Sequence, residues 1–446
     1  MKLAVREDRA AFADAARRDP RDGLKAALGR SPVTAAVDLG ASKVACFIMK
    51  PEGVRSADRT ITTAGVGYVA SRGVRGGAVV DVDEAAHAIA QAVERAEALA
   101  GVNVSGVTVA TAGGQLASCR LTANVSLGAR PISDADLTRT VAAATSGLKL
   151  PGRRIIHMRP IAWSVDGQKG VKDPRSMFGR QLGLQLLVVS ISDPVYQTLS
   201  HCIERAHLQF EGVVAAPFAS ALAALEADEM DLGAILIDMG GGSTSVAVFS
   251  GGSLTHVDSL AVGGGHVTAD VARGLSTSIA GAERIKTLHG SAIASANEDR
   301  EMIEAPPRGD DPGAGPVVAP RSLLKGIVAP RVEETLELLR ERLKASGAPV
   351  EPGAGIVLTG GASQLAGVRE VAVRVFDRPV RLGRPRRVPH LADAASGPAF
   401  CAAAGVLHRA AFGPREVGAR RPTPNRTVRG RSGVIGRATA WLRENL

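Results

Sequence analysis

Short apolar runs separated by glycine-rich turns fill the chain from position 33 onwards. Runs of this length bounded by turn residues predict β-strands, and the first three are expected at 35–39, 44–49 and 61–66. Residues 81–101 predict an amphipathic helix, because their apolar residues recur at helical spacing and Gly101 can end the helix.

More strands and helices are expected further along. Ser133 and Asp136 form a capping box that predicts a helix over 134–147. Other helices are predicted at 193–208 and 330–346, with two short ones within 266–290 and a strand, glycine turn and helix across 355–376. This alternation predicts an α/β protein, and residues 104–182 predict a compact α+β module inserted into the larger frame.

Two stretches 200 positions apart share an unusual pattern. "AAVDLGASKVACFIM" begins at Ala35 and "ILIDMGGGSTSVAVF" begins at Ile235. In each, an apolar strand ends near an aspartate, and a turn rich in glycine and hydroxyl groups leads into a second strand. An ordinary hairpin turn needs only Asn-Gly or Asp-Gly, so these turns carry more than a hairpin requires.

The residue types in both turns suit a phosphate group. Consecutive backbone N–H groups in a glycine turn form a nest that binds phosphate, and glycine has no Cβ to block its approach. The aspartates would repel phosphate but can face Mg²⁺ through water, so no direct metal ligand is predicted, and Lys43 supplies a point charge. The predicted phosphate-binding residues are Asp38, Gly40, Ser42, Lys43, Asp238, Gly240, Gly241, Gly242, Ser243 and Thr244.

A third glycine turn, "TGGASQL" at 359–365, could lie against a sugar or base through Gly360 and Gly361. One Asp-glycine hairpin alone could be an ordinary surface hairpin that happens to carry polar residues. The presence of two related hairpins is what favours a nucleotide site. No GxxxxGK[ST] motif is present, and the glycine run at 262–268 does not fit GxGxxG.

The basic charge of the chain is concentrated at its ends. The 446 residues suggest two to four domains, and the formal net charge is +10. Residues 413–446 hold eight basic and two acidic side chains, and residues 1–30 hold eight and five. The four isolated cysteines and nine histidines show no zinc-ligand spacing. With no run of about 18 apolar residues and a charged N-terminus unlike a signal peptide, we expect the protein in the cytoplasm.

The C-terminal stretch "SGVIGRATAWLRENL" (432–446) predicts an amphipathic helix on an anionic membrane. Its arginines lie toward the sides of an apolar face, and Trp441 suits a headgroup boundary. The alternative is a helix that docks on the protein itself. Nucleic acid is not an expected partner, because no aromatics are interleaved with the arginines of the linker. The predicted membrane residues are Val434, Ile435, Arg437, Ala438, Trp441, Leu442, Arg443 and Leu446.

The order of two phosphate loops and an adenosine loop resembles the actin, Hsp70 and sugar-kinase superfamily. More specifically, residues 71–97, 240–256, 355–368 and the tail resemble the FtsA family of bacterial actin-like cell-division proteins, with a likeness that covers roughly 33–446.

The resemblance implies an actin-like ATPase fold, two related domains around a nucleotide cleft. The implied parts are an N-terminal extension (1–31), expected to be disordered; subdomain 1A (32–103, 183–212 and 385–412); subdomain 1C (104–182); subdomain 2A (213–258 and 330–384); subdomain 2B (259–329); a flexible basic linker (413–431); and the membrane helix (432–446).

The same resemblance implies a function. It implies binding of ATP with Mg²⁺, with Glu283 and Lys286 as ribose or base contacts; a solvated helical face is the alternative for this pair. It also implies polymerisation, and capture of the C-terminal tail of FtsZ through Arg331, where a plain basic face is the alternative. The protein would tether FtsZ to the cytoplasmic side of the inner membrane at the septum and help recruit later divisome proteins.

Rapid catalysis is not expected. ATP hydrolysis needs a side chain that orients the attacking water, but Ala215, Ala216 and Pro217 occupy the place implied by the superfamily, and Glu211 lies too early. We therefore expect slow or negligible turnover. The competing hypotheses are a small-molecule kinase or phosphatase and a pilus-assembly or chaperone-like protein of the same fold.

Overall fold

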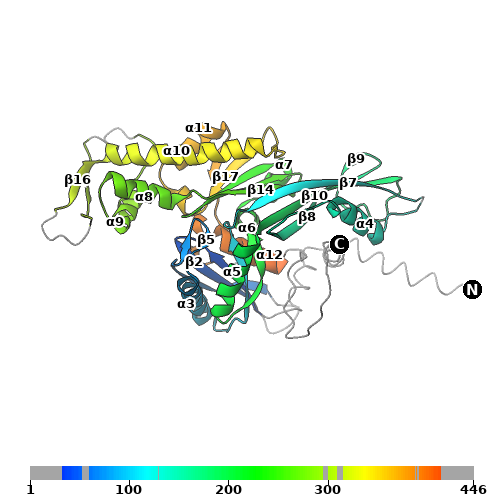
Figure 1. Cartoon of the computed structure of the whole chain (residues 1–446), viewed down its shortest axis with the longest axis horizontal. Helices are drawn as coiled ribbons and strands as arrows, with labels where there is room; N and C mark the ends of the chain where they lie inside the picture. Colours follow the sequence, from blue (N-terminus) through cyan, green and yellow to red (C-terminus); the bar gives the residue numbers. More distant parts are fainter. Residues whose placement is uncertain are drawn as a thin grey trace, which may run out of the picture.

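A computed structural model describes residues 33–52, 60–128, 130–294, 300–308, 315–386, 388 and 391–412. The expected N-terminal extension, the basic linker and the membrane helix lie outside these residues. Figure 1 shows two sheets, one below the other, with the long helix α10 (Arg321–Ala345) along the outer side of the upper one.

The first sheet has five strands in the order β11-β6-β1-β2-β3. The strands β1, β2 and β3 form an antiparallel meander, while β6 and β11 run parallel to β1. Their bounds are β1 Thr34–Leu39, β2 Lys43–Glu52, β3 Thr60–Ala70, β6 Gly106–Thr111 and β11 Gln209–Ala215.

The second sheet repeats this topology in the order β18-β17-β12-β13-β14. The strands β12, β13 and β14 form the meander, and β17 and β18 run parallel to β12. Their bounds are β12 Ala234–Met239, β13 Thr244–Ser250, β14 Ser253–Leu260, β17 Gly355–Thr359 and β18 Val380–Leu382. The two matching sheets confirm the predicted α/β class and show that the near-repeat in the sequence is a repeat of structure.

Helices pack on both sheets and complete two large cores, the first of which also includes buried residues from one face of the second sheet. The first domain carries α3 (Val82–Ala100), α5 (Asp193–Arg205) and α12 (Cys401–Phe412), and α6 (Ala216–Ala224) lies in the same core. The second carries α8 (Gly264–Gly274), α9 (Ile279–His289), α10 and α11 (Val368–Phe376). The helix predicted at 81–101 is confirmed: the Asp81 side chain accepts from the Glu84 amide, and Gly101 ends the helix at φ 64°.

The inserted module extends the second sheet beyond β14 with β7 (Ala117–Ser126), β10 (Gln181–Ser192), β8 (Arg153–Val165) and β9 (Gln168–Val171). These strands lie at the right of Figure 1 and enclose a third core with α4 (Asp134–Thr145). The sequence-based bounds of 104–182 are wrong at both ends. The strand β6 pairs with β1 and β11, and β10 runs ten residues past 182.

The prediction of a helix start at 330 is also wrong, because α10 begins at Arg321 and contains Pro330 in its interior. An interior proline clashes with the carbonyl four residues earlier and removes one hydrogen bond. That earlier residue is Gly326, where a Cβ would meet open space outside the helix. The helix therefore crosses the expected boundary between 2B and 2A.

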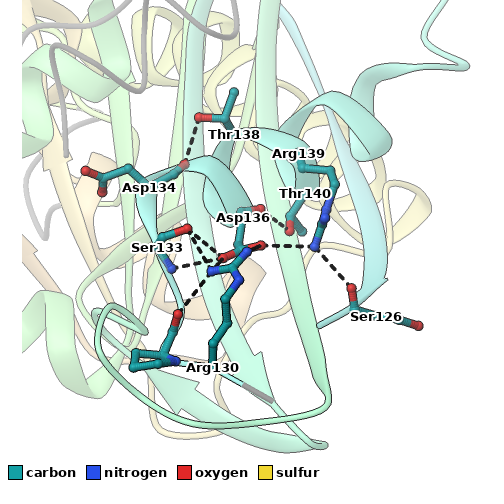
Figure 2. A network of polar contacts seen from close by, with 9 residues as sticks. Ser126, Arg130, Ser133, Asp134, Asp136, Thr138, Arg139 and Thr140 are labelled. Carbon is teal, nitrogen blue, oxygen red and sulfur yellow. Dashed lines mark hydrogen bonds and ion pairs between the residues drawn. The ribbon is translucent and has the colours of Figure 1, made fainter. Parts of the chain in front are cut away.

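A buried carboxylate organises the start of α4. Figure 2 shows Asp136 surrounded by Arg130, Arg139 and Ser133. Arg130 donates to both Asp136 oxygens at 2.8 and 2.9 Å, and Arg139 donates at 3.0 Å. The Ser133 hydroxyl and amide donate at 2.7 and 3.0 Å, which completes the predicted capping box. Burial alone would raise the pKa of Asp136, but the hydrogen bonds from Ser133 and Arg130 outweigh it and lower the pKa to about 2.

We predict that Asp136→Asn lowers the free energy of unfolding at neutral pH by about 1–2 kcal/mol, allowing for screening of the half-exposed arginines. Because the folded pKa is depressed, this contribution is complete above the unfolded pKa of about 3.9 and disappears as the pH falls toward about 2. Urea denaturation of both proteins across this range measures it. Asp134→Asn is the control, because its side chain is 79% exposed. A stability gap that stays constant down to pH 2 would contradict the assignment.

Candidate functional site

The two predicted hairpins close in the same way. The Gly40 amide donates to the carbonyl of Lys43 at 3.0 Å, and the Gly240 amide donates to the carbonyl of Ser243 at 2.8 Å. A Cβ on Gly40 or Gly240 would lie 2.9 or 3.2 Å from the accepting oxygen. Glycine at these two positions therefore permits the tight closure of each turn.

The tips of the two hairpins are in contact. A Cβ on Gly241 would lie 2.5 Å from the Ser42 Oγ, and a Cβ on Gly242 would lie 2.7 Å from the Ala41 Cβ. The hairpins come from different domains, so glycine at 241 and 242 lets the domains approach backbone to backbone.

A further turn, which the sequence analysis missed, lies beside this contact. A Cβ on Gly242 would also lie 3.1 and 3.0 Å from the amide nitrogens of Gly76 and Gly77. These residues form the turn between β4 (Val74–Arg75) and β5 (Ala78–Val79), and a Cβ on Gly113 would overlap the carbonyl of Gly77. In the sequence, this close backbone approach could have been predicted from the pair of glycines after Arg75, which resembles the pair at 241 and 242.

The glycine run of the 262–268 stretch, Gly263–Gly265, supports the second hairpin through backbone hydrogen bonds. The amides of Gly264 and Gly265 donate to the carbonyls of Gly240 and Gly241 at 2.9 and 2.7 Å. The Thr244 hydroxyl, which is buried, donates to the carbonyl of Val262 at 2.8 Å. The run fits no dinucleotide motif, yet it joins the first turn of α8 to the hairpin. Comparison with the GxGxxG motif alone does not reveal this role of the run.

Two carboxylates and one ammonium interact where the two hairpins meet. Burial raises the pKa of Asp38 to about 6; attraction to Lys43 opposes the rise and repulsion from Asp238 adds to it. Burial also raises the pKa of Asp238, against a hydrogen bond from Ser220 and attraction to Lys43. Burial lowers the pKa of Lys43, and attraction to the two carboxylates offsets this effect only in part. The three charges predicted from the sequence therefore interact with one another.

The third glycine turn is also part of this cluster. Gly360 has φ 84°, and a Cβ there would overlap the Oδ1 of Asp238 and the carbonyl of Met239. A Cβ on Gly361 would only touch Ala399, at 3.8 Å. Only the first glycine of this pair is therefore required by its surroundings.

Lys43 connects the first hairpin to the segment before α12. Its ammonium donates to the carbonyl of Ala399 and lies 3.6 Å from the centroid of the Phe400 ring. The Thr359 hydroxyl and the Gly360 amide donate to the carbonyl of Pro398 at 3.0 and 3.2 Å. The short helix η4 (Pro398–Phe400) is thus held by the first hairpin and by the third turn together.

Glu283 and Lys286 lie on α9, beside the start of α8. The Lys286 ammonium contacts the Glu283 carboxylate at 2.7 Å, the Thr268 hydroxyl at 2.8 Å and the Gly264 carbonyl at 3.2 Å. A Cβ on Gly264 would lie 3.0 Å from the Cβ of Ala362, in the third turn. The Lys286 side chain is only 12% exposed, so a solvated face does not describe it. Its role toward a nucleoside stays a prediction.

The residues of the cleft fit Mg²⁺ held through water. Within the described part of the chain, no three or more His, Cys, Asp or Glu side chains gather as metal ligands. Mg²⁺ usually keeps several of its waters and binds through one or two carboxylates and substrate phosphates. Asp38 and Asp238 at the ends of two strands provide that donor set.

The segment before the second hairpin holds one polar side chain that the sequence analysis overlooked. The Ser220 hydroxyl, on α6, donates to the Oδ2 of Asp238 at 2.6 Å. Glu211 lies at a bulge near the start of β11, whereas Ser220 lies on α6, which follows the end of that strand. Ala215, Ala216 and Pro217 surround the start of α6 and provide no polar side chain there.

Arg331 lies on α10, outside the cleft. It donates to Asp270 of α8 and to Glu334, both at 2.5 Å. The hydrogen bond to Asp270 raises the pKa of Arg331 against the effect of burial. The predicted membrane residues between 434 and 446 lie outside the described residues. Across the described part of the chain, no helix has both the length and the apolar character needed to cross a bilayer.

Two domains of matching topology, joined at a pair of glycine hairpins, define an actin-like α/β protein. Comparisons with solved structures agree. The type IV pilus PilM–PilN complex matches with a TM-score of 0.59 at 17% identity, over 86% of this chain and 99% of that chain. MreB5 of Spiroplasma citri bound to ADP matches with a TM-score of 0.50 at 13% identity, over 85% and 96%. These likenesses show the fold alone.

Sequence comparisons identify the family. The family model "Cell division protein FtsA" matches residues 235–405, and "SHS2 domain inserted in FTSA" matches residues 113–190, close to the β7–β10 module. FtsA of Agrobacterium fabrum is 41% identical over 93% of this chain and 95% of its own length. FtsA of Rhizobium meliloti is 43% identical over 85% and 87%, and FtsA of Escherichia coli K12 is 31% identical over 83% and 89%. The chain belongs to the FtsA family of cell division proteins.

We predict that Gly360→Ala lowers the free energy of unfolding by about 2–4 kcal/mol. The alanine would have to adopt a positive φ, and its Cβ would overlap Asp238. Gly361→Ala is the matched control and should stay within about 1 kcal/mol of the parent, because its Cβ meets only an ordinary contact. Urea denaturation compares the two variants. Equal stability would show that Gly360 does not need to be glycine.

Proposed function

We propose that the cleft binds ATP with Mg²⁺ and that the protein is an ATP-dependent, polymerising adaptor of cell division. The single observation that carries the nucleotide site is the meeting of two equivalent glycine hairpins over a shared pair of carboxylates. The fold neighbour MreB5 of Spiroplasma citri, solved bound to ADP and to AMPPNP, supports this proposal.

Each part of the site has a distinct task in this proposal. Backbone amides and hydroxyls at the hairpin tips, from Ser42 and residues 241–243, bind phosphate oxygens. The amides of Gly40 and Gly240 and the hydroxyl of Thr244 are bonded within the protein and hold the turns in shape. Asp38 and Asp238 hold Mg²⁺ through water, and the metal neutralises phosphate charge when bound. Lys43 adds a point charge. The nucleoside lies toward Gly360, Gly361, Glu283 and Lys286.

The contact between the hairpin tips has a consequence for binding. Ser42 and Gly241 lie too close for a phosphate group to fit between them. Nucleotide entry between the tips therefore requires the two domains to separate slightly. Because no polar side chain at 215–217 orients a water molecule, turnover is slow or negligible. The nucleotide then acts through occupancy rather than through hydrolysis.

The adaptor role follows from membership of the FtsA family and from the charge of the chain ends. The C-terminal tail of FtsZ binds at 2B, and our candidate contact is Arg331 on α10, just past the expected boundary with 2A. Since Arg331 already pairs with Asp270 and Glu334, an acidic peptide would have to share or replace these partners. The protein also binds copies of itself and later divisome proteins. It lies on the cytoplasmic side of the inner membrane at the septum.

The membrane attachment belongs to residues 432–446. One short helix of this kind binds reversibly, and polymerisation multiplies its effect, since each subunit presents another helix at high effective concentration. Family membership favours this role over a kinase, a pilus-assembly protein or a chaperone of the same fold.

We predict that Gly241→Asp abolishes ATP binding, because a carboxylate in the phosphate nest repels the phosphates and also meets Ser42. Isothermal titration calorimetry of the full chain with MgATP measures the loss. Gly241→Ala separates the steric effect from the charge effect, and Gly353→Asp places the same charge where a side chain meets open space. Parental affinity in folded Gly241→Asp protein would refute the site.

We predict that Trp441→Glu weakens sedimentation with anionic liposomes more than tenfold, because it removes a large buried side chain and adds a charge to the lipid face. Ala440→Glu is the control, since position 440 falls on the opposite side of a helix. Higher salt should weaken the parent by screening its arginines and leave a hydrophobic remainder. If Trp441→Glu protein pelleted as well as the parent, docking of the helix on the protein itself would be the better explanation.

A further inference from the structure

Ser220 is a polar residue in an otherwise apolar helix. The sequence of α6 is APFASALAA, and Ser220 is fully buried within it. Burying a hydroxyl in apolar surroundings costs free energy unless it forms a hydrogen bond. Its partner here is the Oδ2 of Asp238, at 2.6 Å. The hydroxyl at position 220 is therefore satisfied by the Asp238 carboxylate of the second hairpin, which it holds in turn.

The two oxygens of Asp238 have different surroundings. Oδ2 accepts the hydroxyl of Ser220, while Oδ1 faces Gly360, where even a Cβ would overlap it. The absence of a side chain at 360 lets the backbone pack closely against Oδ1. Among the described residues the hydrogen bond to the carboxylate is made at Oδ2, so Oδ1 keeps its capacity to accept.

The helix that carries Ser220 is itself fixed. At its start, the Ala215 amide donates to the Nε2 of His157, a fully buried side chain of the inserted module, at 2.9 Å. The ring of Phe218 meets His157 edge-on, with centroids 5.2 Å apart, and stacks on Phe249 at 6.4 Å. These contacts prevent α6 from sliding, so the Ser220 hydroxyl keeps one position relative to β12.

We propose that Ser220 is a positioning residue that holds the Asp238 carboxylate in the orientation needed for Mg²⁺-dependent nucleotide binding. This inference rests on the proposed function of the cleft and adds one residue to it. Ser220 need not contact the nucleotide, because it acts through Asp238. Removing its hydroxyl frees the carboxylate to rotate and leaves Oδ2 buried without its donor.

The experiment compares ATP affinity of the full chain in the presence of Mg²⁺ and in EDTA, by calorimetry, for the parent and Ser220→Ala. We expect Ser220→Ala to weaken binding of MgATP about tenfold, the effect of losing one hydrogen bond to a charged group. Binding in EDTA should change less than about twofold. Ser220→Thr, which keeps the hydroxyl, should recover most of the Mg²⁺ effect.

Two controls separate positioning from general stability. Thr140→Ala removes another fully buried helical hydroxyl, on α4 in the inserted module, and should leave both affinities unchanged. In an Asp238→Asn background, Ser220→Ala should have no further effect on Mg²⁺ dependence, because the two residues act as one unit.

The outcomes are distinguishable. A parent that binds no ATP in either condition overturns the proposed function itself. A parent whose binding depends on Mg²⁺, with a Ser220→Ala variant that keeps this dependence, overturns only the role of Ser220. Equal weakening with and without Mg²⁺ also overturns it, because that pattern indicates a structural effect. If Ser220→Ala protein does not fold, parental Mg²⁺ dependence in Asp238→Asn would overturn the proposal, because Ser220 acts only through Asp238.

Discussion

The absence of Cβ atoms where the two domains meet is the constraint on which the rest of the structure depends. Gly241 and Gly242 reach Ser42 and Ala41 at distances that no side chain would allow. Glycine costs about 0.5–1 kcal/mol more than alanine to order in regular structure. The close approach brings two strand-end carboxylates, Asp38 and Asp238, into one cluster, where the charge of Lys43 opposes the effects of burial and repulsion.

The same hairpin also positions the outer elements of the second domain. Because the carbonyls of Gly240 and Gly241 accept the first amides of α8, that helix cannot move without the hairpin. On the other side, Gly360 packs directly on Asp238, and its amide reaches η4. A shift of the second hairpin would therefore reach α8, the third turn and the start of α12. One small motif connects elements that are far apart in the sequence.

The sequence predicted the parts of the fold that carry local signals. The paired hairpins, the helix at 81–101 and the capping box at Ser133 all have such signals, and the structure confirms them. Strand β6 was assigned to the wrong module because a buried parallel strand looks the same whichever sheet it joins. Pro330 was taken as a helix start because helix interiors rarely accept proline. Ser220 was missed because its partner lies 18 positions away and only packing brings them together.

The contact between the hairpin tips also bears on how a nucleotide could act without rapid hydrolysis. A ligand shifts a conformational equilibrium only by its differential affinity for the two states. Because Ser42 and Gly241 leave no room for a phosphate between them, a nucleotide bound as proposed would favour an arrangement in which the domains lie farther apart. Part of its binding free energy is used to separate them, which lowers the apparent affinity and couples occupancy to the angle between the domains. In the proposed function, a contact between protein copies that spans both domains would respond to that angle, so occupancy of the site would govern assembly.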